Sequence, residues 1–412
     1  MSSNYDVVNQ KIISYTSTIV GEFLEKEMNR QDNTVELIAS ENYVSDAIKA
    51  TCGSVFTNKY AEGKPYARYY GGCENVDELE SYCQKKWLDV FGVTDTYHVN
   101  VQPHSGSQAN MAAYMAVLNP GDTILSMSLD NGGHLSHGAK VNFSGKLYNI
   151  VSYNVDSNGF IDYEDLEKKI RYYKPQLILA GASAYSQIID FERIHKIIEA
   201  VRIDRFVGYD EDYRPYFMVD MAHIAGLVAC GEHPSPFGYA DIITTTTHKT
   251  LRGPRGGLIF CKNKLAKKID SAVFPGTQGG PLEHIIAAKA ICAEEALTYE
   301  YHQYIYNVVK NCKAMADEFI KMGYDVITGG TANHLFLIDL SRTHPNLSGK
   351  MVQDELDKHN ITLNKNCVPN EKRSPMQASG LRIGTAAMTT KGWHEEDFIN
   401  CAHQIDEVIK NM

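Results

Sequence analysis

The sequence predicts an α/β protein with a mainly parallel sheet that helices cover on both faces, followed by a smaller α+β domain. Between residues 90 and 265, short β-branched and apolar stretches alternate with helical patterns, which is the rhythm of repeated β-α-β units. A long apolar-periodic helix pattern starts near residue 282, and shorter strand and helix patterns follow it. Residues 7–29 carry apolar side chains at helical intervals and predict an N-terminal helix.

The individual elements follow from turn signals and apolar runs. The expected strands of the large sheet are 97–101, 123–127, 147–153, 177–182, 216–220 and 242–247. The expected elements near the C-terminus are strands 324–328 and 334–340 and helices 349–358 and 394–410. We therefore expect an N-terminal arm over 1–45, a large α/β domain over 46–285 and a small α+β domain over 286–412.

Composition narrows the class of protein. The 412-residue chain is long enough for two domains, and its 43% hydrophobic and 22% charged residues are ordinary for a globular protein. A net charge of -10 argues against general binding to nucleic acid or to anionic membranes. The N-terminus has no signal-peptide pattern, and no apolar run approaches the roughly 20 residues that span a bilayer.

The nine cysteines are scattered and include no CxxC pair. This pattern indicates reduced thiols in a cytoplasmic protein, without a disulfide framework or a structural zinc site. His134, His137 and His223 do not have the HExxH spacing, and no acidic ligand set stands beside them. We expect no metal ion.

The run Thr244–Thr250 places a single lysine, Lys249, at the end of a β-branched strand and directly before a glycine-rich stretch, Arg252–Gly257. A lysine held in this way can form a Schiff base with a carbonyl cofactor. The ordinary alternative is a solvated loop lysine. The residues upstream decide between the two.

Asp220 stands at the end of the expected buried strand 216–220, where open α/β sheets bind ligands. A buried carboxylate needs a cationic partner, and the protonated pyridine nitrogen of pyridoxal phosphate is one. The alternative is that Asp220 caps the next helix. Because one further strand separates Asp220 from Lys249, two neighbouring strand ends would hold opposite ends of one aromatic ring.

Ser105, Gly106 and Ser107 follow the strand 97–101 and open the helical stretch 110–118. Free amides and hydroxyls at a helix N-terminus suit a phosphate, although a plain serine N-cap is the simpler interpretation. The stretch has neither the P-loop nor the GxGxxG pattern, which disfavours nucleotide binding. His134 follows two glycines, and we prefer an imidazole stacked on the cofactor ring to a satisfied core histidine.

The loop 58–72 contains glycine, proline and four tyrosines without any hydrophobic period, so core packing does not explain it. Tyrosine-rich loops often form interfaces. If the active site lies at a dimer interface, the loop would both form the interface and line the active site.

Together these stretches resemble the serine hydroxymethyltransferase family, motif for motif and in order over nearly the whole chain. The matching motifs are Glu36–Asn42, Lys59–Gly72, Val101–Asn110, Val219–Gly226, Thr244–Thr250 and Gln278–Pro281. The resemblance implies a fold-type I enzyme with pyridoxal 5'-phosphate (PLP), a dimer or a dimer of dimers. It implies reversible transfer of the hydroxymethyl carbon of L-serine to tetrahydrofolate, giving glycine and 5,10-methylenetetrahydrofolate.

The resemblance also implies roles for residues of this sequence. Lys249 would hold PLP covalently, Asp220 would hold the ring nitrogen, and Glu62 would move a proton at the hydroxymethyl group or folate. The other cofactor residues would be Ser105, Gly106, Ser107, His134, Ser183, His223, His248, Arg255, Tyr60, Gly279 and Gly280. The substrate residues would be Ser40, Tyr70, His223 and Arg382. The folate residues would be Glu62, Gly133, Leu135, Asn366, Ser374, Pro375 and Met376. Tyr60 and Glu62 are expected from the neighbouring subunit.

Two departures and two rival functions accompany the resemblance. Met376 replaces the aromatic residue usual in the family, and 204–215 is longer and more acidic than expected, which indicates a surface excursion. The rival enzyme is a threonine aldolase or aminotransferase, which would share Lys249, Asp220 and Arg382 but would not need the loop around Glu62. The other rival is a non-catalytic binding protein with the same fold. A dimer is favoured over a tetramer, because no extra insertion would build a second interface.

Overall fold

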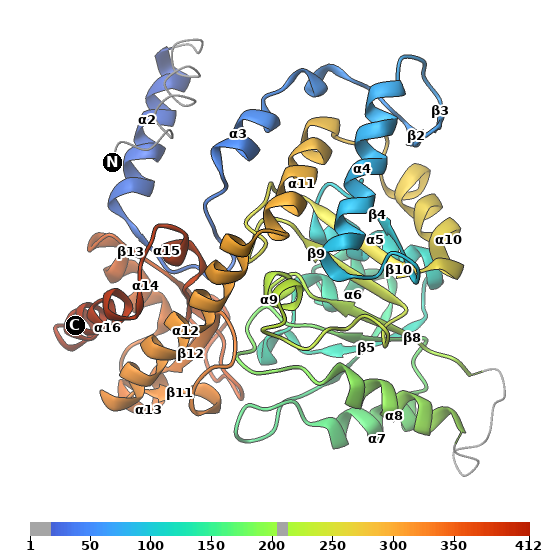
Figure 1. Ribbon diagram of the computed structural model, residues 1–412. Helices are drawn as coiled ribbons and strands as arrows, with labels where there is room; N and C mark the ends of the chain where they lie inside the picture. Colours follow the sequence, from blue (N-terminus) through green and yellow to red (C-terminus); the bar gives the residue numbers. More distant parts are fainter. Residues whose placement is uncertain (1–17, 204–212) are drawn as a thin grey trace.

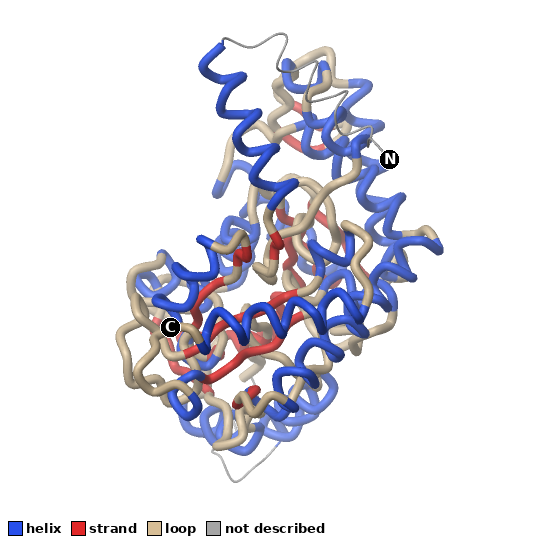
Figure 2. Tube along the Cα trace, turned by 90° about the vertical axis from the view of Figure 1, so that its left-hand side faces the viewer, coloured by secondary structure: helices blue, strands red, loops and turns tan. Residues whose placement is uncertain are grey.

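The computed structural model describes residues 18–203 and 213–412. The predicted N-terminal helix is therefore seen only from Thr18, as α2 (Thr18–Asn33), and its earlier part lies outside the described residues. Most of the acidic 204–215 segment also lies outside them. In Figures 1 and 2, two views at right angles, α2 projects away from the body of the molecule.

The centre of the molecule is a seven-stranded sheet with the order β4-β10-β9-β8-β7-β5-β6. Its strands are β4 (Tyr97–Asn100), β5 (Thr123–Met127), β6 (Asn149–Tyr153), β7 (Leu177–Ala180), β8 (Tyr216–Asp220), β9 (Ile242–Thr246) and β10 (Gly257–Lys262). All pairs are parallel except those of β10, which runs antiparallel to both β4 and β9. The predicted mainly parallel sheet is confirmed, and β10 was not predicted.

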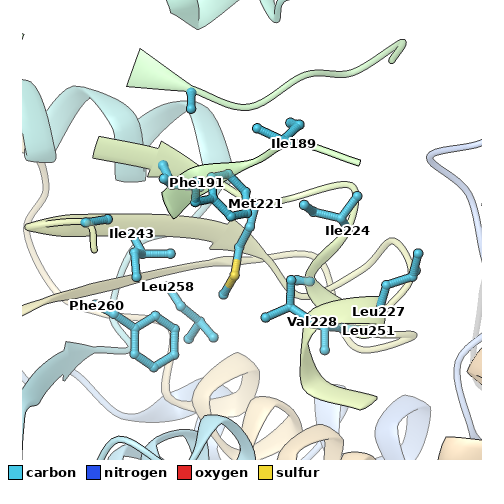
Figure 3. Packing of buried hydrophobic residues seen from close by; sticks show 14 of the residues in the cluster. Ile189, Phe191, Met221, Ile224, Leu227, Val228, Ile243, Leu251, Leu258 and Phe260 are labelled. Atoms are coloured by element: carbon cyan, nitrogen blue, oxygen red, sulfur yellow. The ribbon is translucent and has the colours of Figure 1, made fainter. Parts of the chain in front are cut away.

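Helices cover both faces of this sheet, because its strands are apolar on both sides. Leu177 and Leu179 pack with the helices α5 and α10, whereas Ile178 and Ala180 pack with the cluster on the other face. Figure 3 shows that second cluster, where Ile243, Leu258 and Phe260 meet residues of the segment 221–228. The helices of the large sheet are α3 (Asp46–Cys52), α4 (Glu74–Phe91), α5 (Gly106–Val117), α6 (Phe143–Leu147), α7 (Tyr163–Tyr173), α8 (Phe191–Ile203), α9 (Ala225–Cys230), α10 (Ala266–Ser271) and α11 (Glu283–Ala296).

The C-terminal part has its own sheet and its own core. The sheet order is β11-β12-β15-β14, with β11 (Asp325–Val326), β12 (Leu335–Asp339), β14 (Asn364–Asn366) and β15 (Gly380–Gly384). Its helices are α12 (Tyr299–Lys321), α13 (Leu340–Thr343), α14 (Gly349–Lys358), α15 (Ala386–Thr390) and α16 (Glu395–Lys410). Phe319, Phe336 and Phe398 are fully buried in this second core.

Two contacts join segments that are distant in the sequence. The strand β1 (Val35–Glu36), which follows α2, pairs in parallel with β13 (Ile361–Thr362) of the C-terminal part. The boundary predicted at 285/286 falls inside α11, which packs along α4 and α3 of the large sheet. The division into arm, large and small domains remains a prediction.

The tyrosine loop forms a short hairpin of β2 (Gly63–Lys64) and β3 (Ala67–Arg68). In Figure 1 it lies beyond the upper end of α4, at the top of the molecule. Within 18–203 and 213–412, no helix is both long and apolar enough to cross a lipid bilayer.

Candidate active site

A cavity of about 400 Å³ lies at the carboxyl ends of the central strands. The large sheet, the segment after β1 and the strand β15 all contribute to its lining. The predicted site residues in this lining are Ser40, Ser105, Gly106, Ser107, His134, Ser183, Asp220, His223, His248, Lys249, Arg255 and Arg382. Residues from 40 to 382 thus converge on one cavity.

The two strands that carry the main candidates are neighbours. β8 and β9 are parallel, and Asp220 at the end of β8 pairs with Thr244 on β9, five residues before Lys249. Both side chains line the cavity, and that of Lys249 is only 9% exposed. The prediction that two adjacent strand ends present this carboxylate and this amine to one space is therefore confirmed.

The carboxylate of Asp220 is held by three donors. Its Oδ2 accepts from Nδ2 of Asn110 at 2.9 Å and lies 2.9 Å from Nε2 of His137, while its Oδ1 accepts from the amide of Ala222 at 3.1 Å. Burial alone would raise the pKa of Asp220, but the hydrogen bond and charge of His137, with His134 and Asn110, hold it well below its ordinary value. Asp220 therefore carries a fixed negative charge, and it does not cap the next helix, because the N-cap of α9 is Ile224.

His137 and Asn110 are site residues that the sequence reasoning missed. His137 was weighed only as a metal ligand, and Asn110 only as the start of a helix. Asn110 also accepts from Oγ1 of Thr244 at 2.6 Å, so it joins β8 and β9 to α5. The signal for His137 was its position three residues after His134, because His134 caps the short turn Leu135–His137 that His137 ends.

Lys249 is in the state that a nucleophilic amine requires. Burial lowers its pKa to about 8; Asp220 opposes this shift, and the positive charges of Arg382 and Arg255 add to it. Its backbone carbonyl accepts from Nδ2 of Asn42 at 2.9 Å, which ties the lysine turn to the segment after β1. The turn that carries the amine is thus fixed in place, and the amine loses its proton at a lower pH than an ordinary lysine does.

The N-terminus of α5, a helix of 12 residues, opens into the cavity, and such a terminus suits an anion. Oγ of Ser105 accepts from the amide of Gln108 at 3.3 Å, so the N-cap interpretation is also correct. A Cβ at Gly106 would lie 2.5 Å from Cγ2 of Thr246, so this glycine permits the close approach of helix and strand. In the described part of the chain, Oγ1 of Thr246 and Nδ1 of His248 are buried without a hydrogen-bond partner. Such unpaired polar atoms fit the oxygens of a bound phosphate.

Arg382 supplies a buried cation on the opposite side, from the C-terminal sheet. Its Nε donates to Oδ1 of Asn364 at 3.0 Å and its Nη1 to the carbonyl of Ser183 at 2.7 Å. Burial lowers its pKa to about 10, so it stays protonated at neutral pH. No acidic side chain of residues 18–203 or 213–412 forms an ion pair with it. An unpaired guanidinium in a cavity suits a substrate carboxylate.

Burial favours the neutral form of three cavity histidines, His134, His223 and His248. Burial lowers the pKa of His134 to about 4 and that of His248 to about 3, and nearby positive charges add to both shifts. His223 is buried against His334, with Nδ1 and Nε2 of the two rings 3.1 Å apart. The described residues contain no group of three or more His, Cys, Asp or Glu side chains arranged to hold a metal ion.

Five predicted residues are not in this lining and gather elsewhere. Tyr60 donates from its hydroxyl to Oε1 of Glu62 at 3.3 Å, and its ring packs edge-on against Tyr70 at 5.4 Å between centroids. A Cβ on Gly279 would lie 3.0 Å from Oε1 of Glu62, and one on Gly280 would lie 3.3 Å from the Tyr60 ring. We call these five residues the tyrosine cluster. Tyr60 and Tyr70 are 56% and 50% exposed, which leaves the cluster open to solvent.

The predicted folate residues also lie outside the cavity lining. Leu135 and Met376 are exposed, and Asn366 on β14 pairs with Gly380 on β15, two residues from Arg382. A Cβ on Gly133 would lie 2.3 Å from the carbonyl oxygen of Met127, so the end of β5 requires a glycine there. Ser374 and Pro375 belong to the segment between β14 and β15.

A lysine, a carboxylate and a helix N-terminus at the carboxyl ends of a mainly parallel sheet define the class of fold-type I PLP-dependent enzymes. The comparison with protein families is consistent with this class. The family model described as serine hydroxymethyltransferase matches residues 13–405. The chain belongs to the serine hydroxymethyltransferase family, whose members are PLP-dependent transferases that act on serine, glycine and tetrahydrofolate.

Proposed function

We propose that this chain catalyses the reversible transfer of the hydroxymethyl carbon of L-serine to tetrahydrofolate, with PLP attached covalently to Lys249. One observation carries the proposal: a single cavity combines an amine of lowered pKa, a fixed carboxylate, a helix N-terminus and an unpaired guanidinium. When bound, PLP supplies an electron sink for the charge that develops as the Cα–Cβ bond of serine breaks.

The residues of the cavity fit PLP at each of its ends. Asp220, held charged by His137, would keep the ring nitrogen protonated. The amides and hydroxyls of Ser105–Ser107, with the unpaired atoms of Thr246 and His248, would bind the phosphate. His134 would lie against the ring face, and Ser183 and His223 would contact the ring hydroxyl.

Arg382 would orient the amino acid. The carboxylate of the amino acid would pair with the guanidinium, which has no acidic partner among the described residues. The hydrogen bonds to Asn364 and Ser183 hold the guanidinium in position before the substrate binds. Ser40 and Tyr70 would assist at the substrate. Arg255, close to Lys249 and His248, would help to order the site.

The tyrosine cluster supports a homodimer with shared active sites. Glu62 is the proposed group that moves a proton at the hydroxymethyl oxygen or at folate, yet in its own chain it lies outside the cavity lining. We therefore propose that the cluster of one subunit completes the cavity of the other. Tyr60 and Glu62 were expected to come from the neighbouring subunit, and we extend this expectation to Tyr70, Gly279 and Gly280. Exposed apolar side chains on α2, at Ile19, Val20 and Phe23, give the arm a surface for the partner.

Folate would bind at the mouth of the cavity, against Gly133, Leu135, Asn366 and the segment Ser374–Met376. Met376 is 70% exposed and offers an adaptable apolar contact where the family usually has an aromatic ring. We also propose a cytoplasmic location, which the nine free cysteines support.

The test is formation of glycine from L-serine by the purified, PLP-loaded protein. We expect turnover that depends on tetrahydrofolate and yields 5,10-methylenetetrahydrofolate. Cleavage of allo-threonine without any tetrahydrofolate-dependent conversion of serine would instead identify a threonine aldolase. A wild-type protein that cannot be loaded with PLP would contradict the whole proposal.

A further inference from the structure

Lys289 is a buried cation on α11 that lies outside the cavity lining. Its side chain is among the largest fully buried ones, with 1% of the residue exposed. Nζ donates to the carbonyl oxygens of Val101 at 2.6 Å, Pro103 at 3.0 Å and Gly257 at 2.9 Å. An ammonium group has three donors and no acceptor, so the number of donors matches the number of carbonyls.

The three carbonyls belong to two segments that lead into the anion site. Val101 and Pro103 lie between β4 and Ser105, and Gly257 opens β10 just after Arg255. These two segments also meet directly, because the amide of Gly257 donates to the carbonyl of Pro103 at 3.1 Å. Lys289 thus joins the segment that carries the Ser105–Ser107 turn to the neighbouring strand.

Two glycines show how close this packing is. A Cβ on Gly256 would lie 2.4 Å from Cε of Lys289, so the lysine side chain passes through the space that a larger residue would fill. A Cβ on Gly257 would lie 2.5 Å from the carbonyl oxygen of Ser105. The Ser105–Ser107 turn is therefore held in position by its close contact with β10, to which Lys289 ties the preceding segment.

The burial of this charge is costly and indicates a specific role. A buried ammonium loses its hydration, and an apolar side chain would fill the same volume without that loss. Burial lowers the pKa of Lys289, and the nearby carboxyl groups of Glu80 and Glu283 oppose this shift. Gln102, between the two bonded carbonyls, donates to Glu80 at 2.8 Å and to the carbonyl of Gly63 at 2.9 Å. The buried network thus continues to the tyrosine loop.

We propose that Lys289 is a positioning residue for the cofactor phosphate, which it serves by holding the Ser105–Ser107 turn against β10. The inference rests on the proposed function, because that function places the PLP phosphate at this turn. Lys289 touches neither substrate nor cofactor. It acts through the three carbonyls.

The test compares PLP with pyridoxal, which has the same ring and aldehyde but no phosphate. Dissociation constants are measured by titrating the cofactor-free protein and recording the absorbance of the bound ring. Loss of charged hydrogen bonds should raise the constant for PLP about tenfold or more in Lys289→Met, whereas the constant for pyridoxal should stay within about twofold. Lys268→Met, which removes an exposed lysine of α10, is the matched control and should change neither constant.

A second variant keeps the lysine and moves it. Gly256→Ala should displace the Lys289 side chain and weaken PLP binding in the same phosphate-specific way. In a Lys289→Ala background, the space is free, so adding Gly256→Ala should change the PLP constant by less than about twofold. If Lys289→Met does not fold, Gly256→Ala carries the same test.

Equal PLP affinity in Lys289→Met and wild type would overturn the inference, as would equal weakening for PLP and pyridoxal. Additive effects of Gly256→Ala and Lys289→Ala would overturn it as well. A wild-type protein that binds neither compound would instead overturn the proposed function.

Discussion

The cavity and the tyrosine cluster differ in how completely one chain builds them. In the cavity, Asp220 has three donors, and Arg382 and Lys249 are buried and held by neighbouring strands and loops. In the tyrosine cluster, both tyrosines are at least half exposed, and Glu62 is hydrogen-bonded by Tyr60 at 3.3 Å. Both regions hold residues predicted for one reaction.

We propose that this difference reflects a division of labour between two chains. A single chain provides the groups that would bind the cofactor and the substrate carboxylate, and these groups are already oriented. Glu62, the proposed proton-moving group, directly precedes the hairpin of β2 and β3, which lies beyond α4 (Figure 1), and we propose that a second chain uses it. The following changes test the two regions, from the largest expected effect to the smallest.

Replacing Lys249 with alanine should have the largest effect. Without the amine, covalent attachment of PLP is lost and turnover should fall about 10³-fold or more. Borohydride reduction followed by peptide mass spectrometry should find PLP on the peptide that contains Lys249 in the wild type and on no peptide in the variant. Lys268→Ala serves as the control, and PLP found on any other lysine of the wild type would contradict the assignment.

Asp220→Asn should have the next largest effect. The substitution keeps the shape but removes the charge that would hold the ring nitrogen protonated, so kcat should fall about 10²-fold or more. It should also break the pair with His137, and a buried pair broken in this way costs about 3–5 kcal/mol in the free energy of unfolding. Steady-state kinetics and thermal unfolding measure the two losses, and an unchanged kcat would rule out the role of Asp220.

Arg382→Lys should act mainly on the amino acid. Lysine keeps the charge but not the planar pair of donors, so KM for serine should rise about tenfold while the dissociation constant for PLP stays the same. The readout is KM measured beside a PLP titration. A variant that loses PLP but keeps its KM would place Arg382 at the cofactor instead.

The smallest effect is the pH dependence of cofactor capture. Only neutral Lys249 attacks an aldehyde, and its pKa is lowered from 10.5 to about 8 by burial. Capture of PLP by the cofactor-free protein should therefore slow as pH falls through about 8 and reach a plateau above it. Because Asp220 raises this pKa, Asp220→Asn should move the midpoint to lower pH. Stopped-flow absorbance gives the rate, and a midpoint near 10.5 would contradict the account.

Many of the residues that line the cavity could be predicted from the sequence, because the strands that carry them are apolar runs flanked by turn residues. Tyr216–Asp220 and Thr123–Met127 have the predicted bounds, since apolar runs flanked by turns define buried parallel strands. β10 was missed because its start is hidden in the glycine-rich stretch after Lys249. The seventh strand matters, since its first residue binds Lys289.

The contacts that hold the site could not be predicted in the same way. His137, on a short turn, and Asn110, on α5, reach Asp220 from 83 and 110 positions away in the sequence. The bond from Arg382 to Ser183 spans 199 positions. Such pairs depend on how the strands are ordered, which local periodicity does not report. The exposed position of the tyrosine cluster likewise became visible only once the hairpin was placed beyond α4.

Mixed dimers of Lys249→Ala and Glu62→Gln test the central claim, that each cavity is completed by a second chain. Random exchange makes half of the molecules heterodimers, and one cavity in each would combine an intact Lys249 with an intact Glu62 of the other subunit. The mixture should then regain about a quarter of wild-type activity, although each variant alone is nearly inactive. Activity that stays at the level of the separate variants, despite proven exchange of subunits, would show that Glu62 acts within its own chain.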